Sequence, residues 1–264
     1  MKFDTVIIGG GLAGLVCGIR LQQKGLKCAI VSAGQSALHF SSGSFDLLNE
    51  LPDGTAVTNP EEAVASLDKS HPYAKIGTKF ADYAKEAKQL LLASGVEVSG
   101  ESNRNVYRIT PMGTTMPTWL TLADFSTLKN SNDVLGKRIL LVNIAGFLDF
   151  NTKFVADAFE ANGAECRIKS VSLPEFERLR QSPTEMRSAN IARVIENKNT
   201  LNALLSTLKG DSNGFDVVAL PAVFGLSSLE PVKVLKDGLN IPVCLVPTMP
   251  PSVPGIRTQK QLRR

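Results

Sequence analysis

The sequence predicts an α/β fold with largely parallel sheets, on the evidence of two patterns. In the first 31 residues, an apolar strand, a glycine-rich turn, an amphipathic helix and a second strand follow one another. After residue 138, strand and helix patterns alternate again, as they do in chains built from βαβ units. With 264 residues and a hydrophobic fraction of 43%, the chain is long and apolar enough for one large domain or two ordinary ones.

The composition excludes several classes of protein. A formal charge of +4, with no block of Lys and Arg, argues against nucleic acid as a partner. No two cysteines form a C-x-x-C pair, so neither a zinc nor an iron–sulfur site is expected, and no other metal site either. The apolar run Thr5 to Ile19 is shorter than the ~20 residues that cross a bilayer. We therefore expect a cytoplasmic protein with no direct membrane span.

The first unit is predicted from strand and helix patterns. The apolar core Val6-Ile7-Ile8 predicts a buried strand over 3–8. Apolar residues at helical spacing follow it: Leu12, Leu15, Val16 and Ile19. Gly25 is expected to end the helix in the left-handed conformation, and Cys28 to Val31 forms the second strand. This order of elements is a complete βαβ-type unit.

The remaining elements are less regular. Residues 34–58 are rich in Gly, Ser, Pro and Asp and read as a loop with a short helix. A helix over 80–93 and short strands over 96–98 and 105–109 follow. The alternating region has strands at 139–144, 165–171, 216–220 and 242–246, and helices at 152–161, 175–181, 185–196 and 200–209. We expect a nucleotide-binding domain whose first segment is 1–110, an inserted α/β region over 111–246, and the start of a return segment over 247–264.

The glycine-rich turn Gly9-Gly10-Gly11-Leu12-Ala13-Gly14 fits the pattern G-x-G-x-x-G. The first glycine of such a turn permits the sharp bend, the second lets a phosphate approach the backbone, and the third lets helix and strand pack closely. The helix that follows directs free N–H groups and a positive dipole end at the phosphate. The predicted cofactor-binding residues are Gly9, Gly11, Leu12, Ala13 and Gly14.

One element of an adenosine-binding unit is missing. Such units carry Asp or Glu at the end of the second strand, where it accepts hydrogen bonds from the ribose. Here Ser32, Ala33 and Gly34 hold that place, and a serine hydroxyl, although predicted to contact the cofactor, is a weaker acceptor than a carboxylate. Either the adenosine end is held loosely, or the ligand has no adenosine. FMN meets the second condition, whereas FAD and NAD do not.

A set of specific segments runs from the glycine turn, through the serine-rich loop that follows it, to a proline-rich stretch near the end. These segments are Phe3 to Gly14, Gly34 to Ser44, Leu51-Pro52-Asp53-Gly54, Thr184-Glu185, Asn190-Ile191-Ala192-Arg193, Pro221-Ala222, Phe224-Gly225-Leu226, Pro247 to Val253 and Gly255-Ile256-Arg257. In these segments the sequence strongly resembles the B subunit of bacterial anaerobic glycerol-3-phosphate dehydrogenase. Because members of this family are longer, the chain resembles the N-terminal portion of one.

The resemblance implies a Rossmann-like FAD/NAD(P)-binding flavoprotein fold and an activity. Members oxidise sn-glycerol 3-phosphate to dihydroxyacetone phosphate and pass the electrons to the quinone pool during anaerobic growth. Within the complex, the B subunit either takes part in the oxidation or relays electrons through FMN while the A subunit oxidises the substrate. The implied partners are the catalytic A subunit of the enzyme and its iron–sulfur C subunit, which holds the complex on the inner face of the bacterial inner membrane. The implied cofactor is FMN, in agreement with the missing acid, and FAD is the alternative.

Five further residues, in one loop and at two single positions, are candidates for the chemistry. Ser41, Ser42 and Gly43 follow the second strand and are predicted to lie along the nucleotide, the alternative being an ordinary turn that caps a helix. His39 is the candidate base for the hydroxyl proton of the substrate. Arg257 could bind the substrate phosphate through its planar fork, and a surface role is the alternative.

Two rival functions remain. One is a different FAD-dependent dehydrogenase of the succinate or fumarate class, which would carry FAD rather than FMN. The other is a non-catalytic assembly subunit that keeps the fold but does not retain flavin. The identity of the released cofactor separates the first rival from the leading prediction, and the flavin content separates the second.

Overall fold

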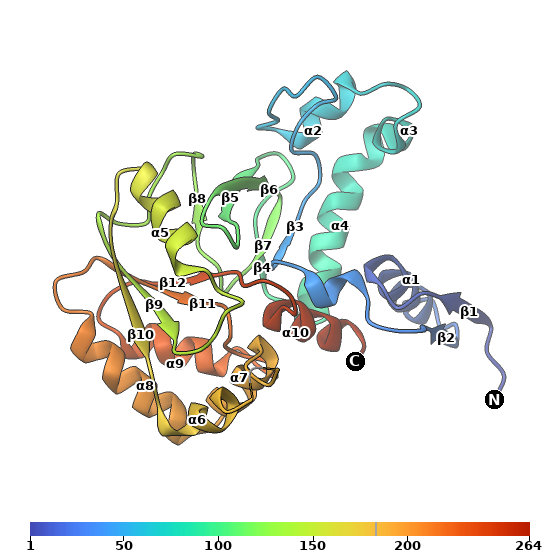
Figure 1. Ribbon diagram of the computed structural model, residues 1–264. Coiled ribbons are helices and arrows are strands. Elements are labelled where there is room, and N and C mark those ends of the chain that lie inside the picture. The colour runs from blue at the N-terminus through green and yellow to red at the C-terminus, as the bar shows by residue number, and fades with distance from the viewer. Residues whose placement is uncertain (183) are drawn as a thin grey trace.

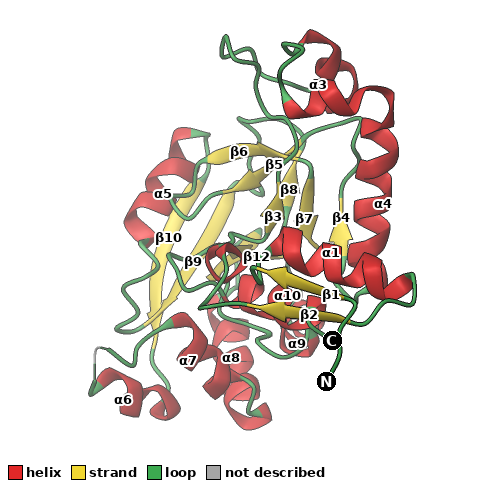
Figure 2. Cartoon of the chain, turned by 90° about the vertical axis from the view of Figure 1, so that its right-hand side faces the viewer, coloured by secondary structure: helices red, strands yellow, loops and turns green. Residues whose placement is uncertain are grey.

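In the computed structural model, which describes residues 1–182 and 184–264, the chain forms two parallel and two small antiparallel sheets. The N-terminal unit and the larger parallel sheet lie on opposite sides of the molecule, and the antiparallel sheets lie between the larger parallel sheet and a long helix (Figures 1 and 2). The predicted α/β class with parallel sheets is confirmed. None of the helices in the described part of the chain combines the length and apolar character that crossing a bilayer requires.

The N-terminal unit has the predicted order of elements. It consists of β1 (Thr5–Ile8), α1 (Leu12–Gln23) and β2 (Cys28–Val31), with the two strands parallel. Helix α1 packs its apolar stripe inward, and Leu15 at its centre is buried. Gly25 follows the helix with φ of +82°, so the predicted left-handed end is confirmed.

The prediction that the first strand is buried is wrong. Side chains alternate across a strand, and Ile7 contacts α1, whereas Val6 and Ile8 face away from it and are 58% and 90% exposed. The reason is the size of the sheet, because β1 pairs with β2 alone within the described residues. An apolar run needs covering elements on both sides before its side chains are removed from water.

The middle of the chain joins short strands to one long helix. The predicted helix over 80–93 is confirmed as α4 (Phe80–Ala93). Around it lie short helices and strands that are mostly two to five residues long: η1 (Ala37–Phe40), β3 (Ser44–Phe45), α2 (Pro60–Ala63), η2 (Val64–Ser66), α3 (Pro72–Ile76), η3 (Gly77–Lys79), β4 (Val98–Ser99), β5 (Val106–Ile109), β6 (Thr115–Thr118), β7 (Leu120–Leu122) and β8 (Thr127–Leu128). Strands β3, β7 and β4 form one antiparallel sheet, and β6, β5 and β8 form the other.

The second α/β region is a four-stranded parallel sheet covered on both faces. Its elements are β9 (Arg138–Ile144), α5 (Thr152–Ala161), β10 (Glu165–Val171), α6 (Pro174–Arg180), α7 (Ser188–Ile195), α8 (Lys198–Asp211), β11 (Val217–Pro221), α9 (Glu230–Gly238) and β12 (Val243–Val246). The strand order is β10-β9-β11-β12, with α5 on one face and α8 and α9 on the other (Figure 1). All predicted elements of this region are present, and α9 is an addition. The domain boundaries at 110, 246 and 247 stay a prediction.

The last helix, α10 (Val253–Leu262), lies between the two halves of the molecule (Figure 1). It packs against η1, α1 and α7. The approach to η1 is close, because a Cβ atom on Gly255 would lie 2.0 Å from the Leu38 carbonyl oxygen. Ser252 caps the helix by accepting from the Gly255 N–H, and its own N–H donates to the His39 carbonyl oxygen at 3.0 Å.

Candidate functional site

The glycine turn has the shape that a phosphate site requires. Gly9 has φ of +110°, which L side chains rarely adopt. A Cβ atom on Gly14 would lie 1.9 Å from the Gly9 carbonyl oxygen, so helix and turn could not pack with a side chain there. On Gly11, by contrast, the nearest atom to a Cβ would be 4.0 Å away. The space beside Gly11 is therefore open to a ligand, and the residues present fit the phosphate of a nucleotide.

Charge at this turn also favours an anion. Gly11 is the N-cap of α1 and provides no side-chain cap, and the first turn of the helix contains no acidic residue. The α1 amide groups and dipole are thus directed toward the turn, with Leu12 and Ala13 as the first helical residues. Arg263, which the sequence analysis did not predict, places Nη2 3.5 Å from where a Cβ on Gly10 would lie. Binding at Gly9, Gly11 and Gly14 stays a prediction.

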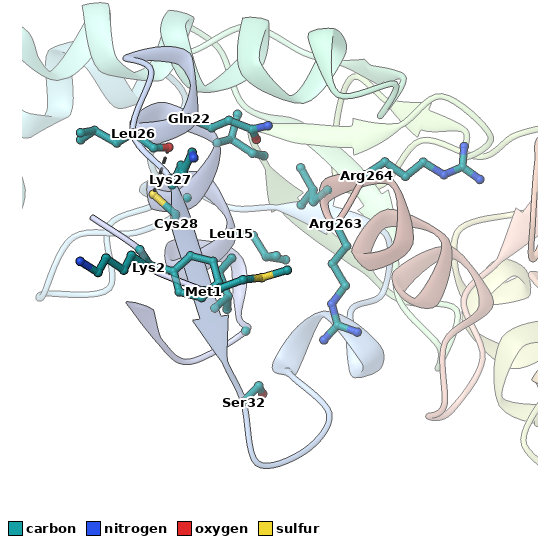
Figure 3. A pocket seen from close by; sticks show the side chains of 16 residues that line it. Met1, Lys2, Leu15, Gln22, Leu26, Lys27, Cys28, Ser32, Arg263 and Arg264 are labelled. Atoms are coloured by element: carbon teal, nitrogen blue, oxygen red, sulfur yellow. Dashed lines mark hydrogen bonds between the residues drawn. The ribbon is translucent and has the colours of Figure 1, made fainter. Parts of the chain in front are cut away.

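A cavity of about 850 Å³ runs along the N-terminal unit beside α1. Figure 3 shows Arg263 extending from the end of α10 toward the end of β2 that carries Ser32. The Ser32 hydroxyl donates to the Gly34 carbonyl oxygen at 3.0 Å. The Ser32 oxygen can still accept a hydrogen bond. As the sequence predicted, this neutral hydroxyl stands where adenosine-binding units carry a carboxylate.

The serine-rich loop lies against α1 and the small β3-β7-β4 sheet. Gly43 has φ of +88°, and a Cβ there would lie 2.3 Å from the ring of Phe125, so only glycine fits. The Gly43 N–H donates to the Ser41 hydroxyl at 3.3 Å. Ser41 lines a second cavity, of about 380 Å³, together with Leu12, whereas Ser42 is half-buried beside it. The structure thus brings Ser41 to the helix of the glycine turn, and a contact of this loop with the nucleotide stays a prediction.

His39 lies on η1 and lines a third cavity, of about 470 Å³. Partial burial lowers the pKa of its imidazole, because the charged form is disfavoured away from water. The neutral ring, which meets Phe40 edge-on at a centroid distance of 5.6 Å, can accept a proton. This geometry is compatible with the predicted role as a base, which stays a prediction.

Arg257 is a buried side chain rather than a surface one. Only 2% of the residue is exposed, and its Nη2 lies 2.7 Å from Oδ2 of the equally buried Asp124. Its Nη1 donates to the carbonyl oxygens of Phe224 and Gly225 at 3.3 and 2.5 Å. The alternative of a surface role is therefore wrong, because α10 is covered on this side. Binding a substrate phosphate would require the ion pair to open, so the arrangement favours a structural role.

Sequence reasoning missed the partners that tertiary packing supplies. Asp124 is 133 positions from Arg257, and no local pattern links them. Gln259 is buried and donates to the Ser36 hydroxyl at 2.9 Å, which ties α10 to the loop after β2. Among the described side chains, no group of three or more His, Cys, Asp and Glu is arranged to hold a metal ion.

The chain matches the protein family described as "FAD binding domain" over residues 4–264. The B subunit of anaerobic glycerol-3-phosphate dehydrogenase from Yersinia pseudotuberculosis is 43% identical over 268 residues, which cover 100% of this chain and 63% of the relative. The protein of the same name from Pectobacterium atrosepticum is 44% identical over 266 residues, 99% of this chain and 63% of the relative. The chain therefore spans less than two thirds of the length of these relatives.

Among solved structures, methylenetetrahydrofolate dehydrogenase-cyclohydrolase of Trypanosoma brucei aligns over 98% of this chain and 83% of its own, at 13% identity. Its TM-score of 0.20 is too low to carry an argument. The resemblance to the dehydrogenase B subunit, predicted from the glycine turn, the serine-rich loop and the proline-rich stretch, is confirmed by the curated relatives. Since the family match extends over nearly the whole sequence, the chain belongs to the FAD-binding-domain family of flavoproteins.

Proposed function

We propose that this chain is the flavin-binding portion of a B subunit of anaerobic glycerol-3-phosphate dehydrogenase. The observation that carries the proposal is 42–44% identity to proteins of that name along the full chain. The open space beside Gly11, at the uncapped start of α1, supports it because this is where a nucleotide phosphate fits.

The flavin is FAD or FMN, and two observations favour different answers. The description of the family favours FAD over the FMN expected from the sequence. The neutral Ser32 at the end of β2, in place of a ribose-binding acid, favours FMN. Release of the cofactor by acid from the co-expressed complex, followed by mass spectrometry, distinguishes the two by the mass of the adenylate part.

The reaction under this proposal removes a hydride from carbon 2 of glycerol 3-phosphate and the proton from its hydroxyl. A flavin, when bound, would supply the acceptor for the hydride. The chain's own contribution is to hold the flavin phosphate at the glycine turn, with Arg263 beside it, and to accept the proton at the ring of His39, whose lowered pKa keeps it neutral. The product is dihydroxyacetone phosphate, and the electrons continue to the quinone pool.

The proposed partners follow from the name of the relatives. A protein named as the B subunit of an enzyme implies a complex of several chains. The other chains that we propose are the catalytic A subunit of the dehydrogenase and its iron–sulfur C subunit. Through the latter the complex would be peripheral on the inner face of the bacterial inner membrane.

The test is the flavin content of the Gly11→Val variant, measured by visible absorbance after co-expression with the partners. The side chain would fill the open space and block the phosphate, so we expect flavin to be lost. Gly210→Val is the matched control, because a Cβ there also meets open space but lies on α8, outside the turn. Normal flavin in Gly11→Val would contradict the site, and a flavin-free wild-type complex would favour an assembly subunit.

A further inference from the structure

The third cavity, which we call the basic cavity, is lined by cationic side chains from separate parts of the chain. It has a volume of about 470 Å³ and lies among η1, α7 and α10. Arg187 and Arg193 come from the start and the body of α7, whereas Lys260 and Arg263 come from the end of α10. The neutral ring of His39 on η1 also lines the cavity. Like charges from two segments, α7 and α10, converge here, although such convergence costs stability when nothing balances it.

Most of this positive charge is unbalanced. Arg187 Nη1 lies 3.0 Å from both carboxylate oxygens of Asp149. For Arg193, Lys260 and Arg263, no carboxylate of the described chain lies within ion-pair distance. Glu185, which lines a neighbouring cavity, accepts from the side chain of the lining residue Asn190 at 3.0 Å. The cavity therefore has an excess of positive charge that an anion would neutralise.

The position of the basic cavity in the fold is one where α/β proteins bind ligands. Asp149, which holds Arg187, follows β9, and the lining residue Leu226 follows β11. These two strands are neighbours, and the strand order reverses between them, since β10 lies on one side and β11 and β12 on the other. Ligands of open parallel sheets bind beyond the carboxyl ends of strands at such a reversal.

Neighbouring groups make the basic cavity suited to a small polar anion. Buried Gln259 lines it and is held in place by its hydrogen bond to Ser36. The lining residue Ala189 lies in the first turn of α7, whose N-cap residue makes no side-chain cap hydrogen bond. Arg263 lines both this cavity and the cavity beside the glycine turn, so the two sites are adjacent.

We propose that the basic cavity binds the phosphate group of a phosphomonoester, with Arg193 and Lys260 as its principal cationic contacts. Under the proposed function, on which this assignment of the substrate rests, the ligand is glycerol 3-phosphate. Its phosphate would lie between α7 and α10, and its glycerol part would point toward His39. A dianion matches the unbalanced charge, and guanidinium and ammonium groups are the usual phosphate contacts of proteins.

The test titrates inorganic phosphate, glycerol 3-phosphate and glycerol into the full 264-residue chain by calorimetry at low ionic strength. We expect both phosphates to bind and glycerol not to. Arg193→Gln and Lys260→Gln should each weaken phosphate binding about tenfold, because each removes a charge-assisted hydrogen bond. Arg167→Gln is the matched control, since Arg167 is an exposed arginine on β10 outside the cavity and the change in charge is the same.

The outcomes separate this inference from the proposed function. Unchanged affinity in both Arg193→Gln and Lys260→Gln, or an equal loss in Arg167→Gln, would overturn the cavity as the phosphate site. If the two variants lose phosphate affinity but the wild-type complex does not oxidise glycerol 3-phosphate, the phosphate site stands and the proposed function fails. If that complex is active and the variants raise KM with unchanged kcat, both are supported.

Discussion

The first strand of the N-terminal unit and the first strand of the second α/β region have similar apolar sequences, but one is partly exposed to water and the other is buried. Val6-Ile7-Ile8 in β1 and Leu140-Leu141-Val142 in β9 are both uninterrupted apolar runs. Ile8 is 90% exposed, whereas Ile139 at the start of β9 is 1% exposed. Strand β9 pairs with β10 on one edge and with β11 on the other, and helices cover both faces, while β1 pairs only with β2 within the described residues.

The difference teaches that an apolar run determines the strand but not its burial. The preference of these apolar residues for a β-strand is local, so both segments form strands. Burial depends on how many other segments reach the strand, which no local pattern records. The following variants test whether the second α/β region is buried while the N-terminal unit is exposed to water. They are given in order of decreasing expected effect on stability.

The largest effect is expected at the buried ion pair that joins α10 to the rest of the molecule. Arg257→Met leaves Asp124 charged and without its partner, so unfolding should become about 3–5 kcal/mol easier. Arg20→Met removes the exposed ion pair that joins α1 of the N-terminal unit to Glu86 of α4, and it should cost less than about 1 kcal/mol. Urea unfolding of both variants provides the measurement. Equal losses of stability in the two variants would mean that Arg257 is not buried in solution.

The next comparison uses the same substitution in the two strands. Ile139→Ala creates a cavity in the core and should destabilise the chain by about 2–5 kcal/mol. Ile8→Ala removes a side chain that is already in water and should change stability by less than about 0.5 kcal/mol. Thermal or urea unfolding of the two variants measures both changes in stability. A large loss for Ile8→Ala would show that the outer face of β1 is covered in solution.

A third test uses pH. Burial raises the pKa of the Cys244 thiol on β12 to about 12, so above the unfolded-state value of about 8.5 the unfolded chain ionises while the folded chain does not. Stability is fully present below that pH and should fall by up to about 1.4 kcal/mol per pH unit above it. Unfolding of wild type and Cys244→Ala from pH 7 to 10 should show a shallower alkaline slope for the variant. Cys17→Ala, at an exposed position on α1, should keep the wild-type slope.

The smallest effect concerns two glycines that end helices. Gly25 and Gly163 both have positive φ and open space around them, so alanine at either strains the backbone by about 1 kcal/mol. Gly163→Ala follows α5 and should lower the midpoint of the main unfolding transition. If the N-terminal unit unfolds separately, Gly25→Ala should leave that midpoint unchanged and raise only the hydrogen exchange of α1. Matching shifts in the two variants would indicate a single cooperative unit.

Much of the fold could be predicted because its signals are local. The bounds of α5 and β10 agree with the sequence prediction to the residue, since the amphipathic spacing of α5 and the alternation of Cys166 and Ile168 with charged residues in β10 are local signals. The short strands β3, β6, β7 and β8 were missed. The existence of β3 and β7 depends on pairing between Ser44 and Thr121, which are distant in the sequence, and so few residues give no period to detect.

The candidate site likewise combines features that local sequence predicts with features that depend on tertiary packing. The spacing of Gly9, Gly11 and Gly14 predicts the turn, because a side chain at these positions would hinder the bend, the approach of a phosphate or the packing of the helix. The position of Arg263 beside Gly10 and the pairing of Arg257 with Asp124 depend on how α10 is placed by the whole fold. The sequence therefore indicated where a phosphate could approach the backbone but not which cations surround it.

The close contact of Gly255 with the Leu38 carbonyl oxygen has a consequence for the spacing of these cations. Any side chain at position 255 would act as a wedge between α10 and η1. Because Lys260 and Arg263 lie on the same helix end, such a wedge would move both of them together relative to His39 and Gly10. The absence of a side chain at position 255, far along the chain from the glycine turn, thus sets the spacing of the cations at the two proposed anion sites.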